Sequence, residues 1–204
     1  MACERSECAE YFPIDEAQIK HFTKKHWWPG SARVITVTLH YLSFGRRVTV
    51  RHLRVRSPYS DTYPLLHMQI EHWRRDDDPD LKQGIVGVIK QILTNKWGYV
   101  GEPKPILVHS QSGVGRAATF IEAALGLELL QNHQSVNLAD LMLQTRCQRL
   151  HCIQNEVQFL LVHRLIIDYL YPQKDPLEKP ANVQAFIRKY DALMARKRNR
   201  AYRK

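Results

Sequence analysis

The stretch Ile106-Leu-Val-His-Ser-Gln-Ser-Gly-Val-Gly-Arg116 decides the fold expected of this chain. Its first three residues are apolar and follow a proline, which predicts a short buried strand. The segment Arg116–Leu130 is rich in Ala and Leu and predicts a helix. Between them, Gly113 and Gly115 give the backbone the freedom to curl, including positive φ. The sequence therefore predicts a strand, a tight loop and a helix in direct succession.

Such a loop is suited to holding a phosphate-like anion. Successive backbone amides in a tight curl point inward and form an anion nest, and a helix N-terminus adds partial positive charge and free N–H donors. The guanidinium of Arg116 can offer a planar fork to two phosphate oxygens. The phosphate-binding positions expected here are Ser110, Gln111, Ser112, Gly113, Val114, Gly115 and Arg116.

The loop resembles the signature of the protein tyrosine phosphatases, in which His-Cys, five residues and Arg are usually followed by Ser or Thr. Two further segments resemble that family in order and spacing: Cys8–Pro13 is similar to its Cys-Ala-x-Tyr-Trp-Pro segment, and Arg146–Phe159 to its Arg-x-Gln-Arg…Val-Gln-Thr-x-x-Gln-Tyr segment. The resemblance implies a phosphotyrosine-type domain of α/β fold, with a twisted mixed β-sheet flanked by helices. In the loop signature, the matching residues are His109, Gly113, Gly115 and Arg116.

Three functional positions of the family carry other residues in this chain. Ser110 stands at the nucleophile position, where catalysis needs a cysteine thiolate with a lowered pKa; a serine hydroxyl is far less acidic and makes a very poor nucleophile. Arg75 stands at the general-acid position, in a loop that begins at Trp73, and an arginine does not usefully give up its proton. Ala117 replaces the hydroxyl residue that follows the arginine.

Other positions keep the residues that the family uses. Gln154 falls on the glutamine that positions water in active members, and Gln158 falls on the later glutamine of that segment. His109 is expected to order the loop from behind through hydrogen bonds. Departures at three separate positions favour a naturally degenerate site over a single engineered substitution. The resemblance thus predicts a pseudophosphatase, which binds a phosphotyrosine protein or a tyrosine-phosphorylated kinase segment through residues 109–116.

Two alternatives of other functional classes remain open. A residual phosphatase would use Asp76 or Asp77 as the acid and an activated water as the nucleophile. A non-enzymatic scaffold would act through the C-terminal tail, where ten Lys/Arg and three Asp/Glu after residue 171 give most of the formal net charge of +10. A basic tail of this kind can contact polyanions or direct nuclear import, although nucleic acid is not the expected partner.

Composition places the chain among ordinary globular proteins. Hydrophobic residues make up 44% and charged residues 25% of its 204 residues. Its sequence contains no apolar run of about 18 residues that would predict a membrane span. Neither the four cysteines nor the acidic run 76–78 forms a pattern that converges on a metal ion, so no metal and no cofactor is expected. Reduced thiols and the lack of an apolar leader indicate a cytoplasmic protein, or a nuclear one if the tail directs import.

Periodicity predicts the remaining elements. Ala32–Leu39 and Arg47–Val55 alternate as two antiparallel strands, with a turn at Ser43–Gly45 and an irregularity near His52. A further strand is expected at His67–Ile70. Helices are expected after Asp78, over Leu138–Thr145 and Glu156–Tyr171, and in the tail from Val183.

The expected domains are a partial phosphatase-like domain over residues 1–171 and a proline-containing linker with a basic helical tail over residues 172–204. Family segments that normally precede residue 3 are not found. The chain is therefore either a fragment or a shortened domain.

Overall fold

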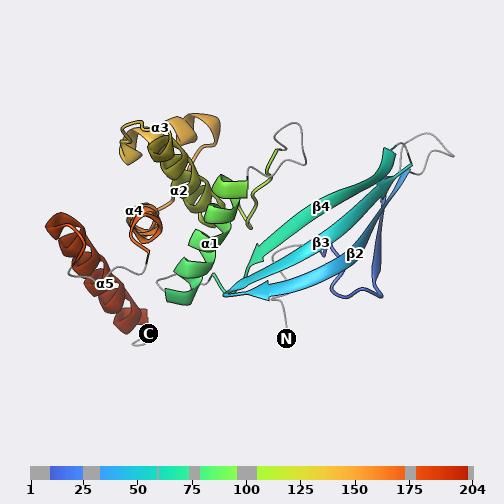
Figure 1. The fold of residues 1–204 in the computed structure, drawn as a ribbon, viewed down its shortest axis with the longest axis horizontal. Helices are drawn as coiled ribbons and strands as arrows, with labels where there is room; N and C mark the ends of the chain where they lie inside the picture. The colour runs from blue at the N-terminus through green and yellow to red at the C-terminus, as the bar shows by residue number, and fades with distance from the viewer. Residues whose placement is uncertain are drawn as a thin grey trace. The chain divides into compact units, whose positions relative to one another are not determined.

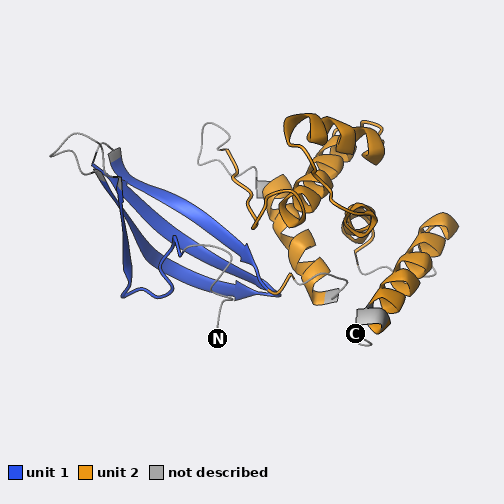
Figure 2. Cartoon of the chain, turned by 180° about the vertical axis from the view of Figure 1, so that it is seen from behind, with its two compact units in different colours: residues 1–71 blue, residues 72–204 orange. Residues whose placement is uncertain are grey.

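A computed structural model describes residues 10–24, 33–58, 60–73, 79–95, 105–172 and 178–201. The chain divides into two compact units, residues 1–71 and residues 72–204 (Figure 2). The first unit holds the strands and the second holds the helices, so each is described by itself. The expected division at residue 171 remains a proposal based on the composition of the tail.

The first unit is a twisted sheet of four antiparallel strands in the order β1-β2-β3-β4 (Figure 1). The α/β class is confirmed, but the described strands form a purely antiparallel sheet where a mixed one was expected. Consecutive strands pair with their neighbours, as short connections allow. The strands are β1 (Ile19–Lys24), β2 (Arg33–Gly45), β3 (Val48–Ser57) and β4 (Ser60–Ile70).

The expected pairing of the second and third strands is confirmed, with two differences. The turn lies at Arg46 and Arg47, beyond the expected Ser43–Gly45, because β2 continues its alternation through those residues. Arg47 has φ +56°, a conformation that tight hairpin turns require. The register shifts between Leu39 and Tyr41 opposite His52. The expected irregularity is therefore present, with the extra residue in β2 rather than in β3.

The core of the first unit lies on one face of this sheet. Val37, Leu39 and Leu53 are buried there, and the partly buried side chains of Phe12, Leu42 and Val55 pack against them. Leu39 and Leu53 are cross-strand partners, as are Val37 and Val55, so the apolar alternation of two neighbouring strands meets on the same face.

The second unit contains the five described helices. They are α1 (Pro79–Asn95), α2 (Arg116–Gln131), α3 (Leu138–Gln148), α4 (Glu156–Leu170) and α5 (Ala181–Ala201). The side chain of Asn137 caps α3 by accepting the N–H of Ala139, and that of Asn155 caps α4 by accepting the N–H of Gln158. All five helices were expected, α2 from its Ala and Leu content and the others from periodicity, and α3 runs three residues further than expected.

Packing follows the apolar faces that the sequence predicts. Leu81, Ile85, Val88 and Ile89 of α1 are buried. α4 contacts α1, α2 and α5, and buries Leu161, Val162, Leu165 and Ile166. This central place agrees with a helix that is apolar nearly all round.

The expected strand at Ile106–Val108 is wrong. The described residues 105–110 have no regular secondary structure, and the side chain of Leu107 is 90% exposed. A strand needs a neighbour to satisfy its backbone N–H and C=O groups. Among the described residues, every strand belongs to the sheet of the first unit and none pairs with this segment, so its apolar character alone does not make it a strand.

Candidate functional site

The loop that precedes α2 is shaped by its two glycines in different ways. Gly113 has φ +73°, as expected of a residue that turns the chain back on itself. Gly115 has a negative φ of −98° and needs no left-handed conformation. A Cβ at Gly115 would lie 2.8 Å from Oε1 of Gln154 and 2.9 Å from Nε2 of Gln158. Glycine is therefore favoured at Gly113 by its backbone conformation, whereas a side chain at Gly115 would displace the ends of the two glutamine side chains.

The loop closes directly onto the first turn of α2. The hydroxyl oxygen of Ser110 accepts a hydrogen bond from the backbone N–H of Ala117, at 3.3 Å. The backbone N–H and the hydroxyl of Thr119 both donate to the carbonyl of Gly115, at 2.9 and 3.1 Å. The side chain of Ser110 thus points at the N-terminal amides of a helix, where the partial positive charge of the backbone is concentrated.

Arg116 is the first residue of α2 and its guanidinium is partly buried. Its Nη1 donates a hydrogen bond of 3.4 Å to the backbone carbonyl of Trp73. This contact joins the loop to the segment in which the general acid of the family is expected. Arg75 and the neighbouring Asp76 and Asp77 lie outside the described residues.

The outer side of the loop is held by the segment between α3 and α4. Nη2 of Arg149 donates to the carbonyl of Ser112 at 3.0 Å, and the N–H of Ile153 donates to the carbonyl of Val114 at 2.9 Å. Arg146 in turn donates to the carbonyls of Cys152 and Ile153, at 2.8 and 2.7 Å. Bonds to charged donors are stronger than neutral ones, so Arg149 holds the loop directly, and Arg146 holds the segment at Ile153 that contacts it.

Ile153 shows how tightly this segment is constrained. Its φ is +57°, which is costly for a β-branched residue. Its side chain is buried, and its N–H and carbonyl are both bonded to the loop or to Arg146. These contacts hold the strained backbone in place.

Gln154 and Gln158 line the side of the loop at Gly115. The side-chain carbonyl of Gln158 accepts the backbone N–H of Gln154 at 2.7 Å, which holds the Gln158 side chain against the turn at Gln154. A hollow of about 220 Å³ lies beside them, lined by Arg146, His151, Ile153 and Gln154. The lining of this hollow is therefore mostly polar and contains an arginine.

A carboxyl group is buried between α2 and α3, on elements that carry the loop. The Glu122 side chain is fully buried and accepts a hydrogen bond from the Thr145 hydroxyl at 2.9 Å. Burial raises the pKa of this carboxyl, although the Thr145 hydrogen bond and the charge of Arg146 oppose the shift.

The two described cysteines differ in environment. Burial raises the pKa of the Cys152 thiol, partly offset by the charge of Arg149, whereas Cys147 is exposed. A buried thiol with a raised pKa is a poor nucleophile. Within the described ranges, no cluster of three or more His, Cys, Asp and Glu side chains could hold a metal ion.

The structure brings most of the expected site residues together. Ser110, Gly115, Arg116 and Ala117 meet at the start of α2, and Gln154 and Gln158 reach Gly115 from α4 and the turn before it. Of the other expected residues in the loop, His109, Gln111 and Ser112 are exposed, and Gly113 and Val114 are half-buried. Their roles remain predictions.

Arg146 and Arg149 were not expected as site residues. They lie in one of the segments that resemble the phosphatase family, 30 and 33 residues beyond Arg116 at the end of the loop, and their residue type alone does not say what they contact. One signal could have suggested them. The backbone carbonyls of an irregular loop need hydrogen-bond donors, and a nearby arginine side chain can supply several.

These features define an α/β protein in which a loop held by an arginine side chain leads directly into a helix. A family model described as protein-tyrosine phosphatase matches residues 1–168. The chain belongs to the protein-tyrosine phosphatase family. Mouse receptor-type tyrosine-protein phosphatase eta is 24% identical over 172 residues, which cover 84% of this chain and 13% of that protein. Rat tyrosine-protein phosphatase non-receptor type 7 is 23% identical over 175 residues, covering 84% of this chain and 44% of that protein.

A solved structure agrees on the fold. The crystal structure of the Trypanosoma brucei protein tyrosine phosphatase TbPTP1 superposes with a TM-score of 0.63 at 20% sequence identity, and the match covers 80% of this chain and 55% of that chain. The chain thus spans about half the length of that phosphatase and less than half of the relatives named above. Among the described helices, none is long and apolar enough to cross a membrane.

Proposed function

We propose that this phosphatase-like domain binds a phosphotyrosine-containing partner, such as a tyrosine-phosphorylated kinase segment, through residues 109–116 without hydrolysing it. The observation that carries the proposal is the pairing of Ser110 and Arg116 at one helix N-terminus. The groups that hold a dianion are kept there, and the group that would attack it is replaced. Ser110, Arg75 and Ala117 together support the loss of catalysis.

Phosphate binding is supported by the donors that converge on the loop. Ser110 already accepts an N–H from the first turn of α2, and a phosphate oxygen placed nearby would meet the same partial positive charge. The bond from Arg116 to the Trp73 carbonyl is long, at 3.4 Å. A dianion is a stronger acceptor than a carbonyl, so the guanidinium can exchange this contact for two phosphate oxygens.

The loss of turnover follows from the chemistry of the side chains. Hydrolysis in this family needs a thiolate to attack phosphorus and an acid to protonate the leaving phenolate. A serine hydroxyl bonded to a backbone N–H as an acceptor is not thereby deprotonated, and Arg75 stays cationic. Gln154 would then act as a wall of the pocket rather than as a positioner of water.

The test is calorimetry with a phosphotyrosine peptide, together with a phosphate-release assay on the same sample. Binding without release is expected, and Arg116→Ala should abolish it. Arg188→Ala, an exposed arginine of α5, is the matched control and should bind as the original chain does. Binding that survives Arg116→Ala would refute the proposal that residues 109–116 bind the phosphate. Phosphate release that disappears in Arg116→Ala would instead establish a residual phosphatase.

A further inference from the structure

The two central strands of the sheet carry a large excess of positive charge (Figure 1). From residue 33 to residue 57, which spans β2, the turn and β3, the sequence has six arginines and neither Asp nor Glu. Arg51 is buried on the core face, where its Nη1 donates to Oε1 of Gln69 at 2.9 Å. Arg54 and Arg56, in contrast, are exposed, so their charge is on the surface.

Alternation along β3 puts these two arginines on the same face of the sheet. Leu53 belongs to the core, and successive side chains of a strand point to opposite faces. His52, Arg54 and Arg56 therefore share the face opposite the core, and all three are exposed. The two arginines are about 7 Å apart along the strand. We call the face that carries these three residues the outer face.

The bulge in β2 adds two rings to the outer face. The register shifts between Leu39 and Tyr41, and the side chains on either side of this shift contact β3. Nη2 of Arg54 donates to Nε2 of His40 at 3.4 Å, and the ring centroids of Tyr41 and His52 are 5.5 Å apart. Tyr41 is 55% exposed. An exposed aromatic pair therefore lies beside the arginines.

Hydroxyl and imidazole groups surround these arginines. Thr36 is the cross-strand partner of Arg56, and Thr38 is that of Arg54. Thr36 also shares a hydrogen bond of 3.3 Å with Nδ1 of His21 in β1. Among the described strand residues that alternation places on the outer face, none is acidic. Within the strands, the positive charge of this face is therefore not balanced.

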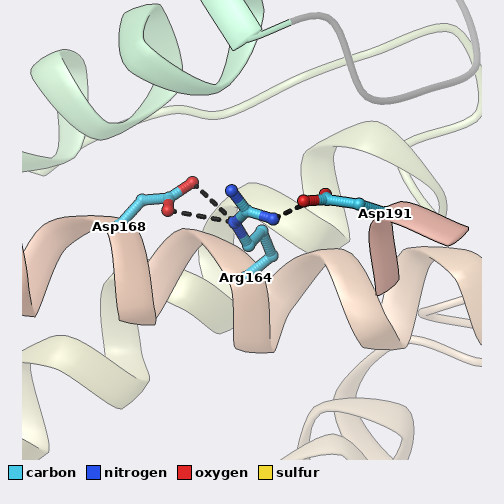
Figure 3. A network of polar contacts seen from close by, with 3 residues as sticks. All are labelled: Arg164, Asp168 and Asp191. Atoms are coloured by element: carbon cyan, nitrogen blue, oxygen red, sulfur yellow. Dashed lines mark hydrogen bonds and ion pairs between the residues drawn. The ribbon is translucent and has the colours of Figure 1, made fainter. Parts of the chain in front are cut away.

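Two cations of the helical unit have a different setting. Arg164 of α4 donates from Nε to both carboxylate oxygens of Asp168, at 3.0 and 3.1 Å, and from Nη1 to Asp191 of α5 at 2.7 Å (Figure 3). Nζ of Lys197 in α5 donates to Glu156 of α4 at 2.7 Å. Those charges join one helix to another, whereas the arginines of the outer face present theirs to a partner.

We propose that the outer face binds a single-stranded nucleic acid, with phosphates on Arg54 and Arg56 and a base on the ring of Tyr41. The guanidinium fork fits phosphate oxygens, and every base has a flat face that can stack on an aromatic side chain. A single strand can turn its unpaired bases toward such a surface. An acidic protein segment would pair with the arginines but would gain little from the rings of Tyr41 and His52, so the rings favour nucleic acid.

This site goes beyond the function proposed above and does not depend on it. The outer face belongs to the first unit, and residues 109–116 belong to the second. Nucleic acid was not expected from the sequence, because other side chains separate the arginines of β3 along the chain. They share a face only once the strand has formed.

The test measures the binding of a short, labelled oligouridine RNA to the full chain by fluorescence anisotropy at several salt concentrations. Arg54→Gln with Arg56→Gln should weaken binding by about two- to thirtyfold, the range for the loss of two exposed charge pairs. The slope of log affinity against log salt should become shallower by about 1.4, because two phosphate contacts are lost. Tyr41→Ala should weaken binding by at least about fivefold, through the loss of stacking.

Three control variants match these changes. Arg188→Gln with Lys189→Gln removes the same charge from exposed positions of α5. Phe44→Ala removes an exposed aromatic ring from β2, but on the core face, because Leu42 two residues earlier packs against the core. Arg116→Ala removes the cation of the loop. All three should bind the RNA as the original chain does.

A second probe separates nucleic acid from other polyanions. An abasic oligomer of the same length carries the same phosphates without bases, and should bind more weakly than the RNA and be insensitive to Tyr41→Ala. Equal affinity for the two probes would refute the proposal and favour an acidic protein segment. Equal losses in the two double variants would also refute it, because net charge alone would then explain binding. RNA binding that is absent, or that is lost in Arg116→Ala, would exclude the outer face as the site.

Discussion

Gly113 offers the sharpest test of the loop geometry, because two separate features of the structure oppose a side chain there. Its φ of +73° costs a residue other than glycine roughly 1–2 kcal/mol. The Cβ of an alanine would also lie 3.0 Å from Nη2 and 3.3 Å from Cζ of Arg149. The guanidinium must then shift by a few tenths of an ångström, which weakens its bond to the Ser112 carbonyl at a cost of up to about 1 kcal/mol.

Gly113→Ala should therefore destabilise the helical unit by about 2 kcal/mol, after allowing about 0.5 kcal/mol for the lower entropy of the unfolded chain. Gly87→Ala is the matched control. Gly87 is an exposed residue inside α1 with no atom within 4 Å of a new Cβ, so alanine there should stabilise by about 0.5–1 kcal/mol. Urea unfolding followed by far-UV circular dichroism should separate the two variants by nearly 3 kcal/mol.

A third variant separates the two contributions to the cost of Gly113→Ala, the backbone conformation and the close contact with Arg149. In an Arg149→Ala background the guanidinium is absent, and Gly113→Ala should cost only its backbone share, about 0.5–1.5 kcal/mol after the same allowance for the unfolded chain. A Gly113→Ala variant as stable as the original chain would refute the left-handed loop. An equal cost with and without Arg149 would refute the close approach of the guanidinium.

Three further outcomes are expected. The pKa of the buried Glu122 carboxyl is raised above its ordinary value of 4.5, so its contribution to stability is complete below about pH 4.5 and is lost as pH rises through the native-state value. Glu122→Gln should flatten this dependence, and unfolding free energies that keep the original pH slope would contradict the assignment. Met194→Ala should cost about 2–4 kcal/mol because the side chain is buried, whereas Asp191→Asn should cost only about 0.5–1 kcal/mol because that carboxylate is half-exposed; equal costs in urea unfolding would argue against the docking of α5. Brief alkylation of the native protein, mapped by mass spectrometry, should modify Cys147 and spare Cys152, and the reverse order would show that the segment before α4 opens readily.

The sequence by itself determined the elements whose signals are local. Apolar spacing predicts α1, α4 and α5, because a helix places residues three and four apart on one face. Alternation predicts the pairing of β2 and β3 for the same kind of reason. Two features of the loop can also be predicted from single residues. A left-handed turn favours glycine, which stands at Gly113. A thiolate nucleophile requires cysteine, and the sequence has Ser110 in its place.

Only the tertiary structure decided which segments meet. Ile106–Val108 is apolar but is not a strand, because strand formation depends on a neighbour that no local pattern specifies. Gly115 lets the side chains of Gln154 and Gln158 approach closely, and Arg149 bonds to a loop residue 37 positions away in sequence.

The tail shows the same division between local and long-range information. Its charge and helical period are visible in the sequence, but its place is set by Arg164, Tyr190 and Lys197 acting across two helices. Contacts between distant residues depend on how the apolar faces pack and on where buried polar groups find partners. Those conditions belong to the whole folded unit, so the position of α5 against α4 was decided by packing and not by the sequence pattern alone.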